Sequence, residues 1–305
     1  MHPHPHIHGL IAAPFTPMHP NGDLQLEKVK NIHGFLHSNG VKGAFICGST
    51  GEHPSLQFEE KKALINEWAK YTSDHFSIIA LVGGNCGADA KALMKYANEK
   101  QLDAVSIVAP NYFPLGSVEA LVDYCAEIAA VVPEMPVYYY HIPVLTGAHF
   151  SMLRFLELAH KSIPNLVGIK YTEENLMEFR LCQAFAEGKY DILWGRDEVL
   201  ISGLAIGAKG AVGSTYNYAA PLYLEIIKAF EAGQMAKAQS LQQQSIEMIQ
   251  LLGKYGGIAV GKSFQKLVGM DCGEFRSPVQ NPSSEQFAAL KGDAERIGFF
   301  DYCSK

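Results

Sequence analysis

The sequence predicts an α/β fold, a (β/α)8 TIM barrel followed by a C-terminal helical extension. Eight short apolar runs alternate with eight stretches of helical periodicity between residues 8 and 232. The runs show no polar–apolar alternation, which is typical of parallel strands covered on both faces. Further helical stretches follow residue 232 with no apolar run between them. Eight strand–helix units of this kind close into a barrel.

The expected strands are the apolar runs, and several end in a glycine. The first follows a short polar tail, and the sixth, LVGIKYT, contains a lysine. The eight strands are expected at residues 8–14, 43–48, 77–82, 104–110, 136–143, 166–172, 191–195 and 211–214.

The expected helices follow the strands in order. A turn at Asn21-Gly22-Asp23 precedes the first, Asn39-Gly40 is a C-cap signal for it, and Ser117 is an N-cap for the fourth. The barrel helices are expected at residues 24–36, 58–71, 88–100, 117–131, 151–160, 174–185, 197–206 and 221–232. The extension is expected to contain helices at residues 235–252, 258–268 and 284–296.

A doubly wound open sheet is the competing architecture. It favours a GxGxxG turn after the first strand, where this chain has Ala12-Ala13-Pro14-Phe15-Thr16 instead. We therefore divide the chain into a His-rich tail (residues 1–7), a barrel (8–232) and a helical extension (233–305).

The composition excludes several classes of partner. The chain has 305 residues, 48% of them hydrophobic, and a net charge of −6. This charge gives no cationic surface for nucleic acid or anionic membrane. No apolar run approaches the ~18–20 residues of a membrane span. We expect neither nucleic acid nor membrane as a partner.

The compartment is predicted from the cysteines and the first residues. Six cysteines are scattered without a CxxC motif, and Met1 to His6 lack the features of a signal peptide. A reduced, cytoplasmic protein is therefore expected.

Lys170 is the one charged residue in the sixth apolar run. Alternation along a strand places it on one face with Gly168 and Thr172. Desolvation lowers the pKa of a lysine from ~10.4 toward ~7, and a neutral amine is what a Schiff-base nucleophile requires. The alternative is a lysine on an edge strand that reaches water.

Active sites in barrels lie at the C-terminal ends of the strands. There, the segment Gly48-Ser49-Thr50-Gly51-Glu52 suits a backbone nest for a carboxylate or phosphate, although it also suits an ordinary turn. Tyr138 and Tyr140 share one face of the fifth strand, with Tyr139 and His141 on the other. A tyrosine near a buried amine can transfer protons, although each tyrosine also suits plain packing.

The seventh and eighth strands also end in polar residues. Gly195-Arg196-Asp197-Glu198 places two carboxylates where they can bind a polyol or simply charge the start of a helix. The segment 213–217, GSTYN, adds hydroxyl groups at the end of the eighth strand.

The histidine-rich start is a possible metal ligand set. His2, His4, His6 and His8 alternate, and His6-Ile7-His8 is an HxH pair. It precedes the first strand, which is the wrong end for a metal-dependent hydrolase barrel. We expect no metal site.

These motifs together resemble the dihydrodipicolinate synthase / N-acetylneuraminate lyase superfamily. The resemblance is carried by Gly48 to Glu52, Tyr140-His141-Ile142-Pro143, Gly168-Ile169-Lys170 and residues 213–217. It is closest to the N-acetylneuraminate lyases, through the run 138–147 and the segment 195–198. It implies a class I aldolase, commonly a homotetramer, that cleaves sialic acid to pyruvate and N-acetylmannosamine. A covalent imine replaces any cofactor.

The resemblance also implies roles for individual residues. Lys170 corresponds to the Schiff-base lysine and Tyr140 to the general acid/base, while Ser49 and Thr50 correspond to the residues that bind the pyruvate carboxylate. Tyr112 corresponds to a tyrosine that completes a proton relay through Thr50, often from a neighbouring subunit. The sugar chain is expected to contact Thr172, Gly195, Asp197, Glu198 and Ser214.

Other readings remain open at this point. Dihydrodipicolinate synthases have an arginine in the segment that here reads Val144-Leu145-Thr146, so a second substrate carboxylate is disfavoured. Another 2-keto-acid aldolase that acts on a keto-deoxy sugar acid stays possible. A non-catalytic sugar-acid sensor is the alternative of a different class, although it needs neither Lys170 nor Tyr140. His141 has no assigned role.

Overall fold

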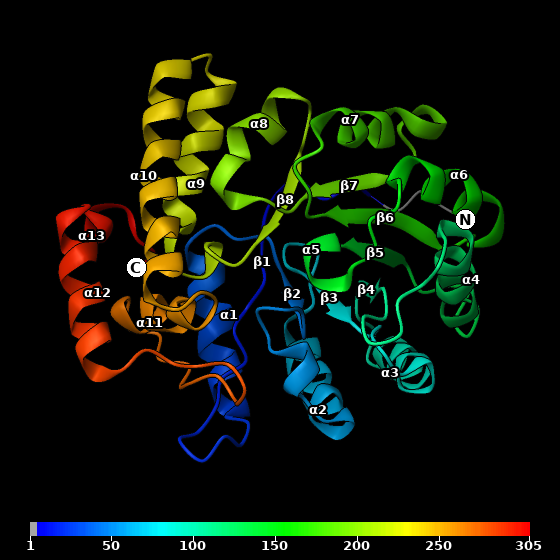
Figure 1. Cartoon of the computed structure of the whole chain (residues 1–305), viewed down its shortest axis with the longest axis horizontal. Helices are drawn as coiled ribbons and strands as arrows, with labels where there is room; N and C mark the ends of the chain where they lie inside the picture. The colour runs from blue at the N-terminus through cyan, green and yellow to red at the C-terminus, as the bar shows by residue number, and fades with distance from the viewer. Residues whose placement is uncertain (1–4) are drawn as a thin grey trace.

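The structure, a computed structural model that describes residues 5–305, is a closed parallel barrel. Its strands are paired in sequence order, and β1 pairs with both β2 and β8, which closes the sheet (Figure 1). The predicted TIM barrel is therefore confirmed. The strands are β1 (Gly9–Ala12), β2 (Gly43–Ile46), β3 (Ser77–Leu81), β4 (Ala104–Val108), β5 (Val137–His141), β6 (Leu166–Tyr171), β7 (Asp191–Trp194) and β8 (Gly210–Gly213).

Helices surround this barrel, as the periodicity predicts. They are α1 (Val29–Ser38), α2 (Phe58–Trp68), α3 (Gly87–Glu99), α4 (Val118–Ala129), α6 (Met152–Ser162), α7 (Leu176–Ala184), α8 (Leu200–Ala205) and α9 (Tyr216–Glu231). Short 3-10 helices adjoin them: η1 (Leu26–Lys28), η2 (His53–Ser55), η3 (Ala69–Tyr71), η4 (Phe185–Gly188) and η5 (Asp197–Val199).

Two predicted boundaries are wrong. We expected a helix to begin at Pro221, but α9 begins at Tyr216 and contains this proline. Ala219, with φ −138°, interrupts the helical geometry just before it. The fifth strand ends at His141, and a short helix, α5 (Pro143–Thr146), follows where we expected more strand.

The C-terminal extension lies on one side of the barrel, against α9 (Figure 1). It consists of α10 (Met235–Tyr255), α11 (Ala259–Leu267), α12 (Ser284–Arg296) and α13 (Phe299–Tyr302), the last of which we did not predict. Within the described residues no strand follows β8. The predicted boundary at residue 233 falls in the turn between α9 and α10, but the domain division itself stays a prediction.

The buried apolar residues form two layers. An inner cluster fills the barrel and includes Phe45, Tyr138 and Tyr140. The larger outer cluster lies between strands and helices and includes Tyr139 and Tyr171. The predicted alternation is thus confirmed along β5 and from Gly168 onward in β6. Val167, expected on one face with Ile169 and Tyr171, packs instead against the inner cluster, where the register of β5 and β6 shifts.

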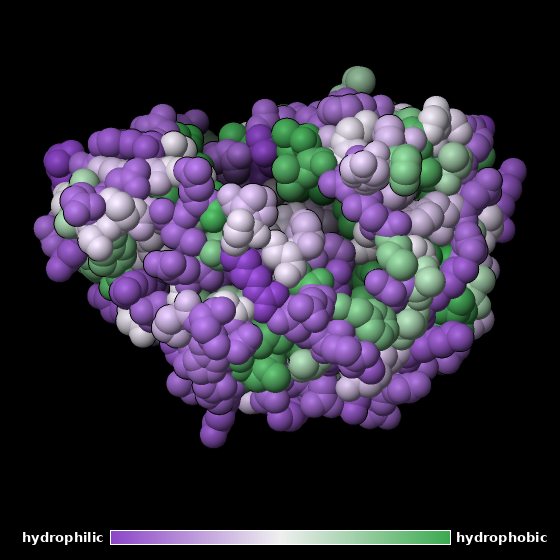
Figure 2. Space-filling model, turned by 60° about the horizontal axis from the view of Figure 1, so that its bottom comes forward, coloured by the Kyte–Doolittle hydropathy of each residue, from purple (hydrophilic) through white to green (hydrophobic). Residues whose placement is uncertain are grey.

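The surface carries mostly hydrophilic residues on the face in Figure 2, with hydrophobic ones in separate patches. Tyr112 and Phe113 are the most exposed large hydrophobic residues in the described chain. None of the described helices combines the length and apolar character needed to cross a membrane.

The described part of the histidine-rich tail, residues 5–7, leads into β1 at the end of the barrel opposite to the C-terminal strand ends. The Ile7 N–H donates to Asp191, the first residue of β7. His6 and His8 therefore lie before β1, as expected, whereas His2 and His4 lie outside the described residues. Between residues 5 and 305 no three His, Cys, Asp or Glu side chains are grouped to hold a metal ion.

Candidate active site

A cavity of about 200 Å³ lies at the C-terminal ends of the strands and is lined by most of the predicted site residues. Alternation within each strand explains why their side chains point inward. The predicted residues that line it are Ser49, Thr50, Tyr140, Lys170, Thr172, Gly195, Asp197, Glu198 and Ser214. Five segments far apart in the sequence therefore bring these nine residues into one pocket, and Tyr112 is the one predicted residue absent from it.

Lys170 lies deep in this cavity, with 4% of its surface exposed. Its neighbour across the β5–β6 pairing is Tyr140. The Lys170 Nζ lies 4.1 Å from the centroid of the Phe45 ring and 4.0 Å from that of Tyr140. None of the ion pairs in the described chain includes Lys170, and its amine lies against two aromatic rings. The edge-strand alternative is thus excluded.

The loop after β2 lines part of the cavity. The backbone N–H groups of Ser49 and Thr50 donate to no protein acceptor within the described chain. Two residues that flank them, Cys47 (φ 54°) and Glu52 (φ 64°), have left-handed backbone conformations. Successive free N–H groups in such a turn form a nest that suits an anion.

Asp197 and Glu198 line the cavity from η5, after β7, and differ from each other. Asp197 is buried, and its Oδ2 accepts from the Thr215 N–H at 3.1 Å and from the Thr215 hydroxyl at 2.6 Å. Its Oδ1 has no hydrogen-bond partner in the described chain. Burial raises the pKa of Asp197 to about 6, and the Thr215 hydroxyl opposes this rise. Glu198 is half-buried and pairs with Arg196 at 3.3 Å.

Two glycines make room for these polar groups. A Cβ on Gly213 would lie 1.9 Å from Asp197 Oδ1, and one on Gly195 would lie 2.3 Å from Thr172 Oγ1. The Thr172 hydroxyl is buried without a partner in the described part of the chain. Glycine is therefore required at both positions for this arrangement.

The C-terminal extension also contributes to the site. Ile258, just before α11, lines the cavity, and Gln242 of α10 donates to the Asp197 carbonyl oxygen at 3.2 Å. Sequence reasoning missed both residues. It also missed Ala13, Ile142, Leu145, Val212 and Gly213. The positions of Ala13 and Gly213 at strand ends could have indicated them, but nothing local indicates Ile258 or Gln242.

Tyr112 does not reach the cavity in this chain. It lies in the loop after β4, is 78% exposed and packs against Phe113. A second cavity of about 290 Å³ adjoins the first and shares Ser49, Tyr140 and Leu145 with it. Tyr112 does not line this second cavity either.

Comparison with known proteins gives the family. Residues 6–296 match the dihydrodipicolinate synthetase family. The chain belongs to this family. An N-acetylneuraminate lyase of Xenopus tropicalis is 41% identical over 238 residues, which cover 77% of this chain and 78% of the relative.

Solved structures of family members agree with the fold. The N-acetylneuraminate lyase of Proteus mirabilis is 37% identical, with a TM-score of 0.94 over 97% of this chain and 100% of that chain. A dihydrodipicolinate synthase of Bacillus anthracis is 27% identical, with a TM-score of 0.88 over 94% and 97% of the two chains. This chain is thus similar to both branches of the family, with higher identity to the lyases.

Proposed function

We propose that this chain is a Schiff-base aldolase that cleaves N-acetylneuraminate to pyruvate and N-acetylmannosamine, with Lys170 as the nucleophile. The observation that carries the proposal is a buried lysine, free of any described ion pair, in a cavity that is also lined by an anion nest and by two carboxylates. This set of groups matches a long 2-keto acid that has both a carboxylate and a polyol chain.

The reaction proceeds through a covalent imine. The neutral amine of Lys170 attacks the C2 ketone of the open-chain sugar acid, and water leaves. Tyr140, as the phenolate formed when its own proton goes to the departing water, takes the proton of the C4 hydroxyl. The C3–C4 bond breaks, and its electron pair moves into the protonated imine. N-acetylmannosamine departs as the aldehyde. The remaining enamine is protonated at C3, and hydrolysis of the imine releases pyruvate and restores the amine, so no metal or organic cofactor is needed.

The cavity lining supports one substrate carboxylate rather than two. Ser49 and Thr50 bind the carboxylate of the pyruvyl part through hydroxyl and backbone N–H groups. Lys170 is the one cation among the described lining residues, and the segment that resembles the arginine-bearing one of the synthases, Val144-Leu145-Thr146, contains no cation. These features favour a sialic acid over the dicarboxylate chemistry of the synthase branch.

We further propose a homotetramer and a reducing, cytoplasmic location. Similarity to the lyases and the exposed Tyr112–Phe113 pair support the assembly, in which Tyr112 completes the relay through Thr50 of a neighbouring subunit. The six cysteines are unpaired, which suits a reducing compartment.

Borohydride reduction in the presence of pyruvate tests the proposal. We expect one reduced pyruvyl group on Lys170, located by peptide mass spectrometry, and none in Lys170→Arg, because an arginine stays protonated. Lys262, the other buried lysine of the described chain, is the internal control, since its amine is bound by Glu52 and it does not line the cavity. Labelling of a different lysine, or no release of pyruvate from N-acetylneuraminate, would refute the proposal.

A further inference from the structure

The loop that carries Ser49 and Thr50 is bound to the C-terminal extension through a buried ion pair. Glu52 ends this loop, and Lys262 lies on α11, 210 residues away in the sequence. The Lys262 Nζ donates to Glu52 Oε1 at 2.8 Å, and each side chain is 2% exposed. A charge that is buried this completely requires its partner, because an unpaired charge in the interior is strongly unfavourable.

Further contacts from the extension fix this pair from several directions. The Arg276 N–H donates to Glu52 Oε2 at 2.9 Å, and Lys262 also donates to the Glu274 carbonyl oxygen at 2.9 Å. Both carboxylate oxygens of Glu52 are therefore held by residues of the extension. The Glu52 side chain consequently has one orientation relative to α11.

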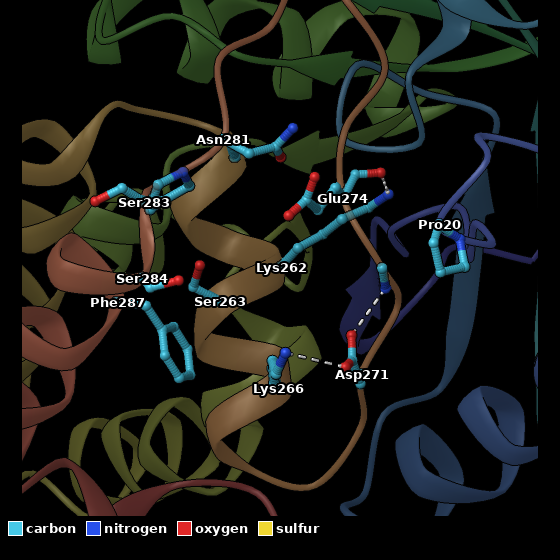
Figure 3. A pocket seen from close by; sticks show the side chains of 13 residues that line it. Pro20, Lys262, Ser263, Lys266, Asp271, Glu274, Asn281, Ser283, Ser284 and Phe287 are labelled. Atoms are coloured by element: carbon cyan, nitrogen blue, oxygen red, sulfur yellow. Dashed lines mark hydrogen bonds and ion pairs between the residues drawn. The ribbon is translucent and has the colours of Figure 1, made fainter.

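A cavity of about 410 Å³ separates α11 from the segment that leads to α12, and Lys262 lines it (Figure 3). Lys262 extends from α11 toward Glu274, whereas Lys266, one turn further along the same helix, pairs with Asp271 at 3.3 Å. Lys266 is 54% exposed and makes no described contact with the loop 47–52. The two lysines thus lie on the same helix and line the same cavity, but Lys262 pairs with Glu52 of this loop and Lys266 with Asp271 of the extension.

The backbone of Glu52 explains why the loop needs this support. Glu52 has φ 64° and ψ 32°, a left-handed conformation that residues with a Cβ disfavour. Its own N–H donates to the Ser49 carbonyl oxygen at 3.1 Å, so a single hydrogen bond connects Glu52 to the nest. We therefore expect a change in the Glu52 side chain to shift the N–H groups of Ser49 and Thr50.

We infer that Glu52 and Lys262 are positioning residues that shape the nest for the keto-acid carboxylate, so that the C-terminal extension sets the affinity for pyruvate. This inference rests on the proposed function. It assigns the extension a role in the reaction, although neither residue lines the active-site cavity.

The direction in which Glu52→Gln changes the affinity for pyruvate distinguishes a positioning role of Glu52 from a simple effect of its charge. In Glu52→Gln a negative charge near the nest disappears, which by itself would strengthen the binding of an anion. Positioning predicts the opposite, since a glutamine offers one acceptor oxygen to two donors. The double variant Glu52→Gln/Lys262→Met removes both charges and leaves the local net charge unchanged.

The measured quantity is the pyruvate concentration that half-saturates borohydride trapping on Lys170. We expect it to rise about 10-fold or more in Glu52→Gln and in the double variant, with a similar rise in KM and a smaller change in kcat. Lys266→Met, the matched control, should leave it unchanged. Glu52→Gln is nearly isosteric and serves alone if the double variant does not fold.

An unchanged or lowered half-saturating concentration in folded Glu52→Gln overturns the inference, and so does an equal rise in Lys266→Met. A lower melting temperature with normal pyruvate trapping indicates a purely structural pair and overturns it as well. The unmodified protein is measured first. If it neither traps pyruvate on Lys170 nor cleaves N-acetylneuraminate, the proposed function itself fails, which is a distinguishable result.

Discussion

Asp197 and Glu198 are neighbours in the sequence but have different surroundings. Asp197 is held by Thr215 and directs a free oxygen toward the cavity, while Glu198 pairs with Arg196 at the rim. A charge-assisted hydrogen bond to a hydroxyl contributes about 1.5–3 kcal/mol. Asp197→Asn should therefore lower kcat/KM for N-acetylneuraminate by roughly 10–100-fold, and Glu198→Gln by less. Steady-state assays of pyruvate release measure both.

Pyruvate trapping on Lys170 should stay normal in these variants, since pyruvate has no polyol chain. Glu174→Gln is the matched control, because Glu174 also pairs with Arg196 but does not line the cavity. If Asp197 and Glu198 only stabilised the N-terminus of η5 through their charge, their variants would have a lower melting temperature but would cleave N-acetylneuraminate at the normal rate. That result would contradict the substrate-binding role.

The raised pKa of Asp197 predicts a pH dependence of stability. The ordinary pKa of an aspartate side chain is 3.8. Burial raises the pKa of Asp197 to about 6 in the folded chain, because it disfavours the ionised form. Between these values the folded state binds the proton and the unfolded state does not, so stability falls as pH rises. The free energy of unfolding should therefore decrease by about 3 kcal/mol, through Asp197 alone, once the pH is above 6.

Asp197→Asn removes this titration, since an asparagine stays neutral. The free energy of unfolding of the variant, minus that of the parent, should therefore increase from pH 4 to pH 6.5 and then level off. Urea denaturation at several pH values, followed by tryptophan fluorescence, gives both quantities. A difference that does not change with pH would show that Asp197 is ionised throughout this range.

At the residue scale, the sequence predicts much of the site because a strand alternates its faces. That rule placed Tyr138 and Tyr140 on one face of the fifth strand and Tyr139 on the other, as observed, but it did not say which face lines the barrel interior. It could not distinguish Asp197 from Glu198, because η5 does not follow the two-residue period of a strand. Nor could it place Ile258, which reaches the cavity from the extension.

Gly213, the last residue of β8, shows how the end of a strand can require glycine. Gly213→Ala would place a Cβ 1.9 Å from Asp197 Oδ1, so this carboxylate must move. We expect sialic acid cleavage to fall roughly 100-fold or more, the upper range for a lost charged contact, while pyruvate trapping is retained. Paired assays of cleavage and borohydride trapping measure the two effects.

Gly253 is the matched control within a helix. A Cβ there meets nothing within 4 Å, and the residue lies inside α10. Gly253→Ala should leave the kinetics unchanged and raise the free energy of unfolding by up to about 1 kcal/mol. Equal kinetic effects of the two alanines would contradict the assigned contact between Gly213 and Asp197.

At the element scale, the sequence predicts which elements exist better than where they begin. All eight strands and eight barrel helices lie near their expected positions, since each is a run of apolar residues of the right period. Pro221 misled the prediction for α9, because a proline commonly opens a helix and here lies within one. The short α13 lacks the length that periodicity needs.

For the whole molecule, the buried contacts of the extension predict one cooperative unit. Lys262 and Gln242 join the extension to the loops after β2 and β7. Cys272 and Cys303 of the extension and Cys125 and Cys182 of the barrel are all buried. We expect all four thiols to become reactive at the same urea concentration, because global unfolding exposes them together.

Thiol labelling at increasing urea, followed by mass spectrometry of each peptide, measures the four midpoints. Cys86, which is exposed in the folded chain, reports the reactivity of an accessible thiol without denaturant. Earlier labelling of Cys272 and Cys303 than of the barrel cysteines would show that the extension unfolds separately.

The sequence could not predict this dependence of the barrel on its extension. Glu52 and Lys262 are 210 residues apart, and each alone resembles an ordinary surface charge. Pairing at such a distance depends on the packing of α11 against the barrel, which no local period encodes. The architecture was therefore predictable, while the contacts that join its parts were not.

The cavity is lined partly by residues of strands and partly by residues outside the sheet, and this has a consequence for the evolution of new substrate specificities. The two residues proposed for the chemistry, Tyr140 and Lys170, lie on the neighbouring strands β5 and β6, whereas Glu198, Ser214 and Ile258 line the cavity from outside the sheet. Substitutions at these three positions can change which aldehyde is accepted without disturbing the amine. A library confined to them would therefore explore new acceptor aldehydes for carbon–carbon bond synthesis while the pyruvate half-reaction is inherited unchanged.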